Sequence, residues 1–178
     1  MHTHAHGMEA ITRRGGWRGL VIAGALAVSA WAGNPAATGA PAKMPAFTLP
    51  DLEGKERKSS EFLGKAVVVD FWATWCETCK ETIPKLAELS RKYQGKGLTV
   101  LGISVDKGSG EKVKKVAAKM GINYLVLHDK ENTMGKAFGF SGIPSVYVFD
   151  RKGNLTRALP GFDPEQESQL ALAAEKAL

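Results

Sequence analysis

The feature that most constrains this chain is the stretch 67–80, where an apolar run leads through a short turn into a helical pattern. The apolar residues occupy consecutive positions, which is typical of a central strand covered on both faces. The turn carries both cysteines of the 178-residue sequence, Cys76 and Cys79, in a C-x-x-C arrangement. At a helix start, free N–H groups and the helix dipole stabilise a thiolate, so the pair is expected to form a thiol/disulfide couple. We expect Cys76 to attack a substrate and Cys79 to attack the resulting mixed disulfide. A merely structural bridge is disfavoured, because so short a loop constrains the unfolded chain little.

Strand and helix patterns alternate along the rest of the chain. In order, the sequence predicts short strands at 47–49 and 56–58, a one-turn helix at 59–63 capped by Ser59 or Ser60, a strand at 67–72, a helix at 76–94 interrupted by Pro84, a strand at 98–105, a helix at 111–120, a strand at 124–127, a helix at 133–138, strands at 145–150 and 155–159, and a last helix capped by Asp163. The long connection between the strands at 67–72 and 98–105 predicts a parallel pair. The turn at 151–154 predicts an antiparallel closing hairpin. The fold class is therefore α/β, a mixed sheet with helices on both faces.

The N-terminus resembles a targeting segment. Three arginines within 13–18 precede an apolar run at 20–30, and an A-x-A pattern ends at Ala32. We expect 1–32 to be a signal peptide or a retained N-terminal membrane anchor, 33–43 to be a Pro/Gly-rich linker, and 44–178 to be the folded domain. An extracytoplasmic location follows, periplasmic or membrane-anchored, in which paired cysteines tend toward the disulfide.

Composition excludes some classes of function. The net charge of +6 is modest and unfocused, and the lysines of the 111–120 helix are expected to form a solvated face. No basic-aromatic pattern points to nucleic acid, and membrane contact is expected only if the N-terminal segment is retained. We expect no metal and no bound cofactor beyond the Cys76–Cys79 disulfide, because His128 is the one histidine after the leader and makes an incomplete site.

Several motifs together resemble the exported TlpA/ResA-like branch of the thioredoxin superfamily. They are Phe71-Trp72-Ala73-Thr74-Trp75-Cys76-Glu77-Thr78-Cys79, Pro45-Ala46-Phe47-Thr48-Leu49-Pro50-Asp51 with Gly54, Pro84, and Gly142-Ile143-Pro144. The resemblance covers roughly 44–178. It implies a thioredoxin-like fold with an N-terminal hairpin and an inserted β/α segment at 106–138. It also implies that Pro144 follows a cis peptide bond and faces the cysteines.

The resemblance suggests roles for further residues. Ile143 and Pro144 would pair with the extended chain of a substrate, and Trp75 would lie at the rim of the site. Asp70 would accept the proton of Cys79, with a pKa raised by burial, and Glu77 would raise the pKa of Cys76. Asp70 and Glu77 also have structural interpretations, as a strand-end acid and an exposed acid near a helix start.

Two positions depart from related patterns. Thr78 stands where the branch frequently has proline, and Gly102 stands where thioredoxin carries the lysine that partners the buried acid. Nothing obvious in the sequence therefore neutralises Asp70.

These features favour a reductant of protein disulfides. The resemblance implies oxidised protein thiols as substrates, with apocytochrome c as a candidate client, and a membrane electron donor of the DsbD or CcdA type. Three alternatives share the fold: an exported disulfide oxidase or isomerase, a copper-binding chaperone that uses both cysteines, and a peroxidase, against which the W-C-x-x-C pattern argues.

Overall fold

The computed structural model describes residues 39–161 and 164–178. The predicted signal or anchor at 1–32, the first part of the linker and the Asp163 cap lie outside these ranges. Within them, no helix combines the length and the apolar character needed to cross a membrane.

A five-stranded mixed sheet organises the domain, in the order β5-β4-β3-β6-β7. Its strands are β3 (Ala66–Trp72), β4 (Leu98–Ser104), β5 (Leu125–His128), β6 (Ser145–Phe149) and β7 (Leu155–Pro160). The pairs β3–β4 and β4–β5 are parallel, whereas β3–β6 and β6–β7 are antiparallel. Every residue of β3 is buried, as its apolar run predicts for a central strand. The predicted mixed α/β fold is confirmed.

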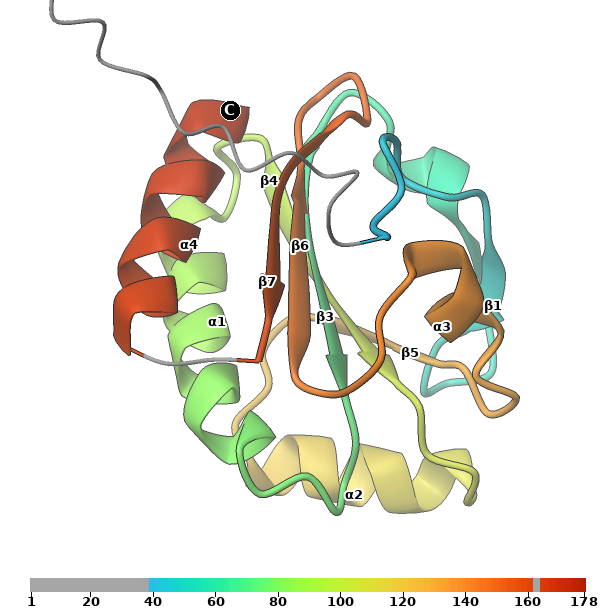
Figure 1. Cartoon of the computed structure of the whole chain (residues 1–178). Coiled ribbons are helices and arrows are strands. Elements are labelled where there is room, and N and C mark those ends of the chain that lie inside the picture. The colour runs from blue at the N-terminus through green and yellow to red at the C-terminus, as the bar shows by residue number, and fades with distance from the viewer. Residues whose placement is uncertain (1–38, 162–163) are drawn as a thin grey trace, which may run out of the picture. The chain divides into compact units, whose positions relative to one another are not determined.

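Helices cover both faces of this sheet (Figure 1). Helices α1 (Cys79–Tyr93) and α4 (Pro164–Ala177) pack against one face, and α3 (Thr133–Phe138) packs against the other. The hairpin of β1 (Thr48–Pro50) and β2 (Glu56–Lys58) joins α3 on that second face, and α2 (Gly110–Lys119) crosses the lower end of the sheet in Figure 1. The N-terminal hairpin and the inserted β/α segment expected from the resemblance are both present.

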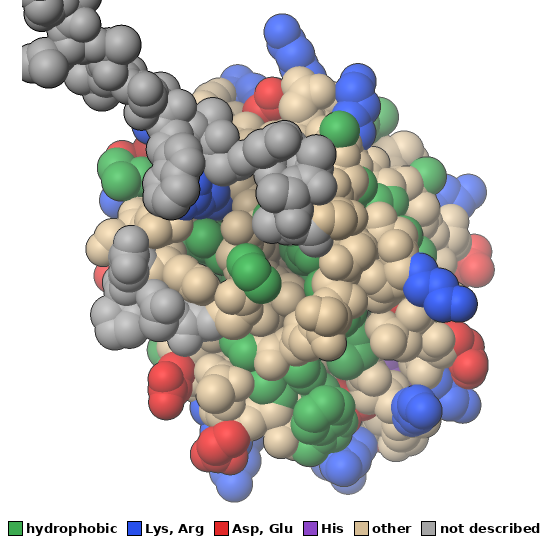
Figure 2. Space-filling view, in the orientation of Figure 1, with side chains coloured by type: hydrophobic (Ala, Val, Ile, Leu, Met, Phe, Trp, Pro, Cys, Tyr) green, Lys and Arg blue, Asp and Glu red, His purple; other side chains and the backbone are tan. Residues whose placement is uncertain are grey.

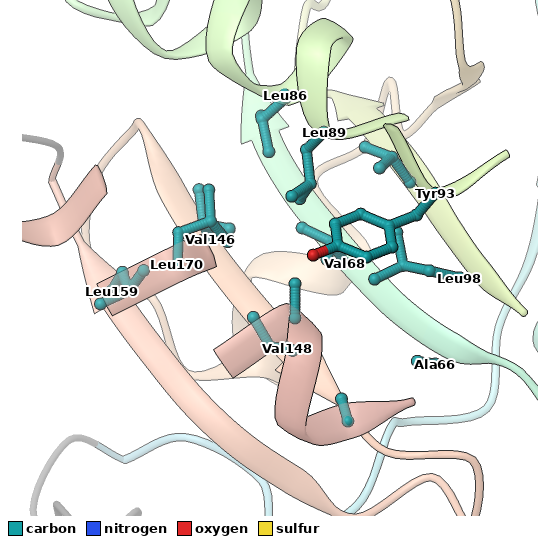
Figure 3. Close-up of a cluster of buried hydrophobic side chains, with 13 residues drawn as sticks. Ala66, Val68, Leu86, Leu89, Tyr93, Leu98, Val146, Val148, Leu159 and Leu170 are labelled. Carbon is teal, nitrogen blue, oxygen red and sulfur yellow. The ribbon is translucent and has the colours of Figure 1, made fainter. Parts of the chain in front are cut away.

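The alternation of side chains along β3 builds two apolar layers. Val67, Val69 and Phe71 point toward α3 and the hairpin, while Val68 and Trp72 point toward the helices of the opposite face. Figure 3 shows Leu86, Leu89 and Tyr93 of α1 directed at the layer that contains Val68. Asp70 lies between Val68 and Trp72 on β3 and therefore belongs to the α1 face.

Some predicted boundaries are wrong. The one-turn helix η2 (Ser59–Phe62) is capped at Lys58 instead of a serine, because the Glu61 carboxylate accepts a hydrogen bond from the Lys58 N–H at 2.7 Å. Strand β5 begins one residue later than predicted, so Tyr124 precedes it. Helix α1 begins at Cys79, three residues later than predicted, with consequences for the site.

The segment before the predicted domain start is tied to the closing hairpin. The Leu155 N–H donates to the Ala42 carbonyl oxygen at 2.9 Å, and the Met44 N–H donates to the Gly153 carbonyl oxygen at 2.8 Å. These two bonds hold the chain on both sides of Lys43, which forms an isolated bridge with Asn154.

Candidate active site

The two cysteines are joined by a disulfide at the end of β3, with a sulfur–sulfur distance of 2.05 Å. Cys76 lies in the turn that precedes α1, and Cys79 is the first residue of the helix. Cys76 retains 5% of its surface and Cys79 retains none, so Cys76 is the sulfur that a substrate can reach. This order agrees with the predicted roles of attacking and resolving cysteine.

Although Cys76 precedes the helix, its sulfur still accepts a hydrogen bond from the first turn of the helix. The Cys79 N–H, one of the free donors of the first turn, donates to Cys76 Sγ at 3.2 Å. The Thr78 hydroxyl lies 3.6 Å from the same sulfur and makes no helix-capping bond. A thiolate on Cys76 would therefore have two neighbouring donors, and proline at position 78 would supply no hydroxyl.

A buried carboxylate holds the turn that leads to the cysteines. Asp106 accepts hydrogen bonds from the Thr74 N–H at 2.9 Å, from the Thr74 hydroxyl at 2.6 Å and from the Ser104 hydroxyl at 2.8 Å. Ser104 ends β4, so these bonds fix the turn to the neighbouring strand. The predictions missed this role of Asp106. The available signal was an acid directly after a buried strand that runs parallel to the cysteine-bearing one.

The loop before β6 lies against the cysteines. The Ile143–Pro144 peptide bond is cis, as the resemblance implies. Ile143 packs against the buried cluster that contains Cys76 and Cys79, and Pro144 is itself buried. The Ser145 hydroxyl donates to the Gly142 carbonyl oxygen at 2.7 Å and closes the loop. The structure thus brings Cys76, Cys79 and Ile143 together, with Pro144 next in the chain, and substrate pairing at Ile143 stays a prediction.

Trp75 and Glu77 face outward. Trp75 is 68% exposed beside the buried Cys76, which suits the predicted rim position. The Glu77 side chain is 82% exposed, and its carboxylate pairs with Lys80 Nζ at 2.5 Å. Because this pair lies in solvent and supplies its own cation, the effect of Glu77 on Cys76 stays a prediction. Figure 2 shows hydrophobic side chains gathered at the lower part of this face, over the C-terminal end of β3 and the N-terminal end of β6. Acidic and basic side chains surround them.

Asp70 is fully buried on the sheet face that α1 and Cys79 cover. Neither carboxylate oxygen has a hydrogen-bond partner among the described residues. Desolvation raises the pKa of Asp70 to about 8, because burial penalises its charged form. Gly102 of β4 lies beside Asp70 of β3. The position at which thioredoxin carries its lysine therefore has no side chain here, as the sequence indicates.

His128 takes part in a structural contact. Its Nε2 lies 2.7 Å from the Asp106 carbonyl oxygen, and the residue is buried at the end of β5. Within residues 39–161 and 164–178, no group of three or more histidine, cysteine or acidic side chains is arranged to hold a metal ion.

The fold and this site define a thioredoxin-like protein with a redox-active C-x-x-C pair. The chain belongs to the AhpC/TSA family, whose model matches residues 41–158.

Named relatives agree with that class. The chain is 31% identical over 117 residues to the thiol-disulfide oxidoreductase ResA of Geobacillus thermodenitrificans, covering 66% of this chain and 67% of that one. It is 27% identical over 132 residues to ResA of Geobacillus kaustophilus, covering 74% and 75%. A provisionally named thiol:disulfide interchange protein DsbE from Chlorobium tepidum superposes with a TM-score of 0.72 at 29% identity, covering 78% of this chain and 96% of that one. The chain is accordingly a thioredoxin-like thiol:disulfide oxidoreductase, and its resemblance to the ResA-like branch is confirmed.

Proposed function

We propose that this protein is an exported reductant of protein disulfides. The observation that carries the direction is the buried Asp70, which has no cationic partner among the described residues and shares a face with the resolving Cys79. An acid with a raised pKa can take the Cys79 proton at near-neutral pH. When Asp70 is ionised, its negative charge close to the dithiol also disfavours the thiolate, and a dithiol with an unfavourable thiolate is the better reductant.

The reaction proceeds in two exchanges. The Cys76 thiolate attacks one sulfur of a substrate disulfide, a mixed disulfide forms, and the other substrate sulfur leaves as a thiolate. Cys79 then gives its proton to the Asp70 carboxylate and attacks Cys76 Sγ. The Cys76–Cys79 disulfide forms, the second substrate sulfur leaves, and the substrate has gained two electrons. The couple needs no bound cofactor in this scheme, and Ile143 and Pro144 would align the substrate strand.

The reduction potential tests the direction. We expect a value nearer to that of thioredoxin, about −270 mV, than to that of a strong oxidant, about −120 mV. The two donors that point at Cys76 Sγ favour the thiolate and pull the other way, so they support the alternative of an oxidase or isomerase. A measured potential above about −180 mV would establish that alternative.

Trapping identifies the substrates. Cys79→Ala in the full chain leaves Cys76 free to attack but removes the resolving sulfur, so mixed disulfides with client proteins should accumulate in cells. The matched control is Cys76→Ala, which should trap none. Absence of trapped clients with the first variant would refute client reduction.

The proposed setting follows from the N-terminal sequence and from the resemblance. Export would place the couple outside the cytosol, where it needs electrons from a membrane donor of the DsbD or CcdA type. A C-x-x-C-H pair in apocytochrome c is a fitting client, because such cysteines must be reduced before haem attachment. Fractionation would test export, and identification of the trapped proteins would test both partners.

A further inference from the structure

Three residues next to Gly102, which has no side chain, carry buried polar atoms without partners in the described part of the chain. Besides the two Asp70 oxygens, Trp72 Nε1 and the Tyr124 hydroxyl are buried and have no hydrogen-bond partner among the described residues. A buried polar group without a partner is energetically costly, so several such groups on neighbouring residues demand an explanation.

The Trp72 indole and the Tyr124 ring come together at Gly102. A Cβ at this residue would lie 3.1 Å from Trp72 Nε1 and 3.1 Å from Tyr124 Cε2, so the indole edge and the phenol ring meet over the glycine. Gly102 is the neighbour of Asp70 in the β3–β4 register, and Trp72 follows Asp70 on the same face of β3. The phenol ring therefore occupies the space that a side chain at position 102 would take.

Tyr124 and Asp70 interact electrostatically across this space. Burial raises the pKa of Tyr124 well above its usual range, and the charge of Asp70 raises it further. The other strand beside Asp70 presents Val146, which does not ionise, and α1 presents the disulfide, which does not titrate.

The charged groups nearest to the other side of Tyr124 neutralise one another. Tyr124 lines a cavity of about 370 Å³ between α2, β5 and the turn of the β1–β2 hairpin. Around this cavity, Arg57 pairs with Asp51 at 2.9 Å and Lys114 pairs with Glu53 at 2.7 Å. Because both cations at the cavity rim are already engaged in ion pairs, the candidates to hydrogen-bond Asp70 are uncharged donors.

We propose that Tyr124, assisted by Trp72, is the positioning residue for Asp70: its buried hydroxyl donates a hydrogen bond to the carboxylate when Asp70 ionises. This takes the place of the charged partner that Gly102 cannot supply. The inference rests on the proposed role of Asp70 as proton acceptor for Cys79. Tyr124 touches no reacting atom and acts through the carboxylate.

The consequence is a defined change in the titration of Asp70. Loss of one hydrogen bond to a charged group is expected to change the proton affinity of that group about tenfold or more. Tyr124→Phe removes the donor and keeps the ring. The proton affinity of Asp70 should rise about tenfold or more. Resolution of a mixed disulfide at pH 7 should slow by a similar factor and approach the wild-type rate at high pH, where Asp70 is ionised in both proteins.

The experiment follows the Asp70 carboxyl directly by ¹³C NMR across pH in the oxidised full chain. We expect Tyr124→Phe to raise the midpoint by about one unit. The matched control Tyr147→Phe changes a tyrosine on the opposite face of the sheet and should leave the midpoint in place. An unmoved midpoint in Tyr124→Phe would overturn the proposal. This readout does not depend on whether the protein acts as reductant or oxidase, which the potential decides separately.

Two further measurements separate positioning from a merely structural role. In an Asp70→Asn background, Tyr124→Phe should cause no additional slowing of resolution, whereas a structural effect would persist. If Tyr124→Phe does not fold, the wild-type protein still provides a test. The chemical shift of the Trp72 indole N–H should change with pH at the same midpoint as the Asp70 carboxyl, and this change should be absent in Asp70→Asn. An indole chemical shift that does not follow the Asp70 titration would contradict the proposed arrangement of donors.

Discussion

At the scale of single residues, the site places hydrogen-bond donors beside one sulfur and a buried acid on the sheet face that the other sulfur covers. Cys76 Sγ faces the Cys79 N–H and the Thr78 hydroxyl, while Cys79 shares its buried face with Asp70. The two cysteines are therefore chemically unequal before any substrate arrives. This inequality is what a two-step exchange requires, because one sulfur must attack and the other must wait.

The raised pKa of Asp70 makes stability depend on pH. Folding raises it from about 3.9 to about 8, so between these values the folded protein holds a proton that the unfolded chain releases. The free energy of unfolding should therefore fall by about 1.4 kcal/mol per pH unit from about pH 5 to pH 8, and level off above. Asp70→Asn should flatten this slope. Urea unfolding of the oxidised protein at several pH values measures it, and an equal slope in both proteins would contradict the assignment.

Thr78 should tune the thiolate of Cys76. Thr78→Val keeps the shape and removes the hydroxyl that lies 3.6 Å from Cys76 Sγ. We expect a higher pKa of Cys76 and a potential more negative by up to about 30 mV, the equivalent of one hydrogen bond of about 1.4 kcal/mol. Thr78→Ser retains the hydroxyl and should remain close to the wild type. Thiolate absorbance and glutathione equilibration measure the two quantities, and a positive shift in potential would refute the contact.

At the scale of elements, the ends of strands and helices are tied down where the site needs them. Asp106 holds the turn before α1, and the cis Ile143–Pro144 peptide closes the loop before β6. On the other face, the end of α3 meets the first described residues of the chain. Gly39 crosses Gly139 so closely that a Cβ on Gly139 would lie 2.1 Å from the Gly39 carbonyl oxygen.

Gly139→Ala should consequently destabilise the domain. Gly139 has a φ of 67°, in the left-handed region, which costs an alanine about 1–2 kcal/mol before the clash with Gly39 is counted. Gly108→Ala is the matched control, because a Cβ there meets nothing within 4 Å and its φ is ordinary. Chemical denaturation measures both, and similar stability of the two variants would contradict the crossing of the segments.

At the scale of the whole molecule, redox state and folding are linked. If the couple is reducing, the folded structure favours the disulfide, and by linkage the disulfide favours the folded structure. The oxidised protein should then unfold at a temperature several degrees higher than the reduced one, since 1 kcal/mol corresponds to about 4–8 °C in a domain of 60–100 residues and about 2–4 °C in one of 150–250 residues, and this domain lies between these sizes. Thermal scans with and without a dithiol reductant measure the difference.

A variant with both Cys76 and Cys79 changed to Ser provides the control, because its unfolding temperature should not respond to the reductant. A reduced wild-type protein more stable than the oxidised one would indicate an oxidant, and would reverse the proposed direction.

The sequence by itself determined the fold class, the central strand and the reacting cysteines. It could do so because an uninterrupted apolar run and a C-x-x-C pair are local patterns with few alternative structures, whereas the cis proline loop is expected only from the family resemblance. It misplaced the start of α1 and the cap of η2, because the choice between a turn and a first helical turn depends on small differences in capping.

Only the tertiary structure decided what surrounds Asp70 and Cys76. Tyr124 and Trp72 meet over Gly102 because three segments distant in the sequence pack at one point, and the Asp106 contacts likewise join two strands through a turn. No periodicity encodes such meetings. Burial and hydrogen bonding of polar groups depend on every element that packs around them, so these contacts exist only once the sheet and its helices have assembled.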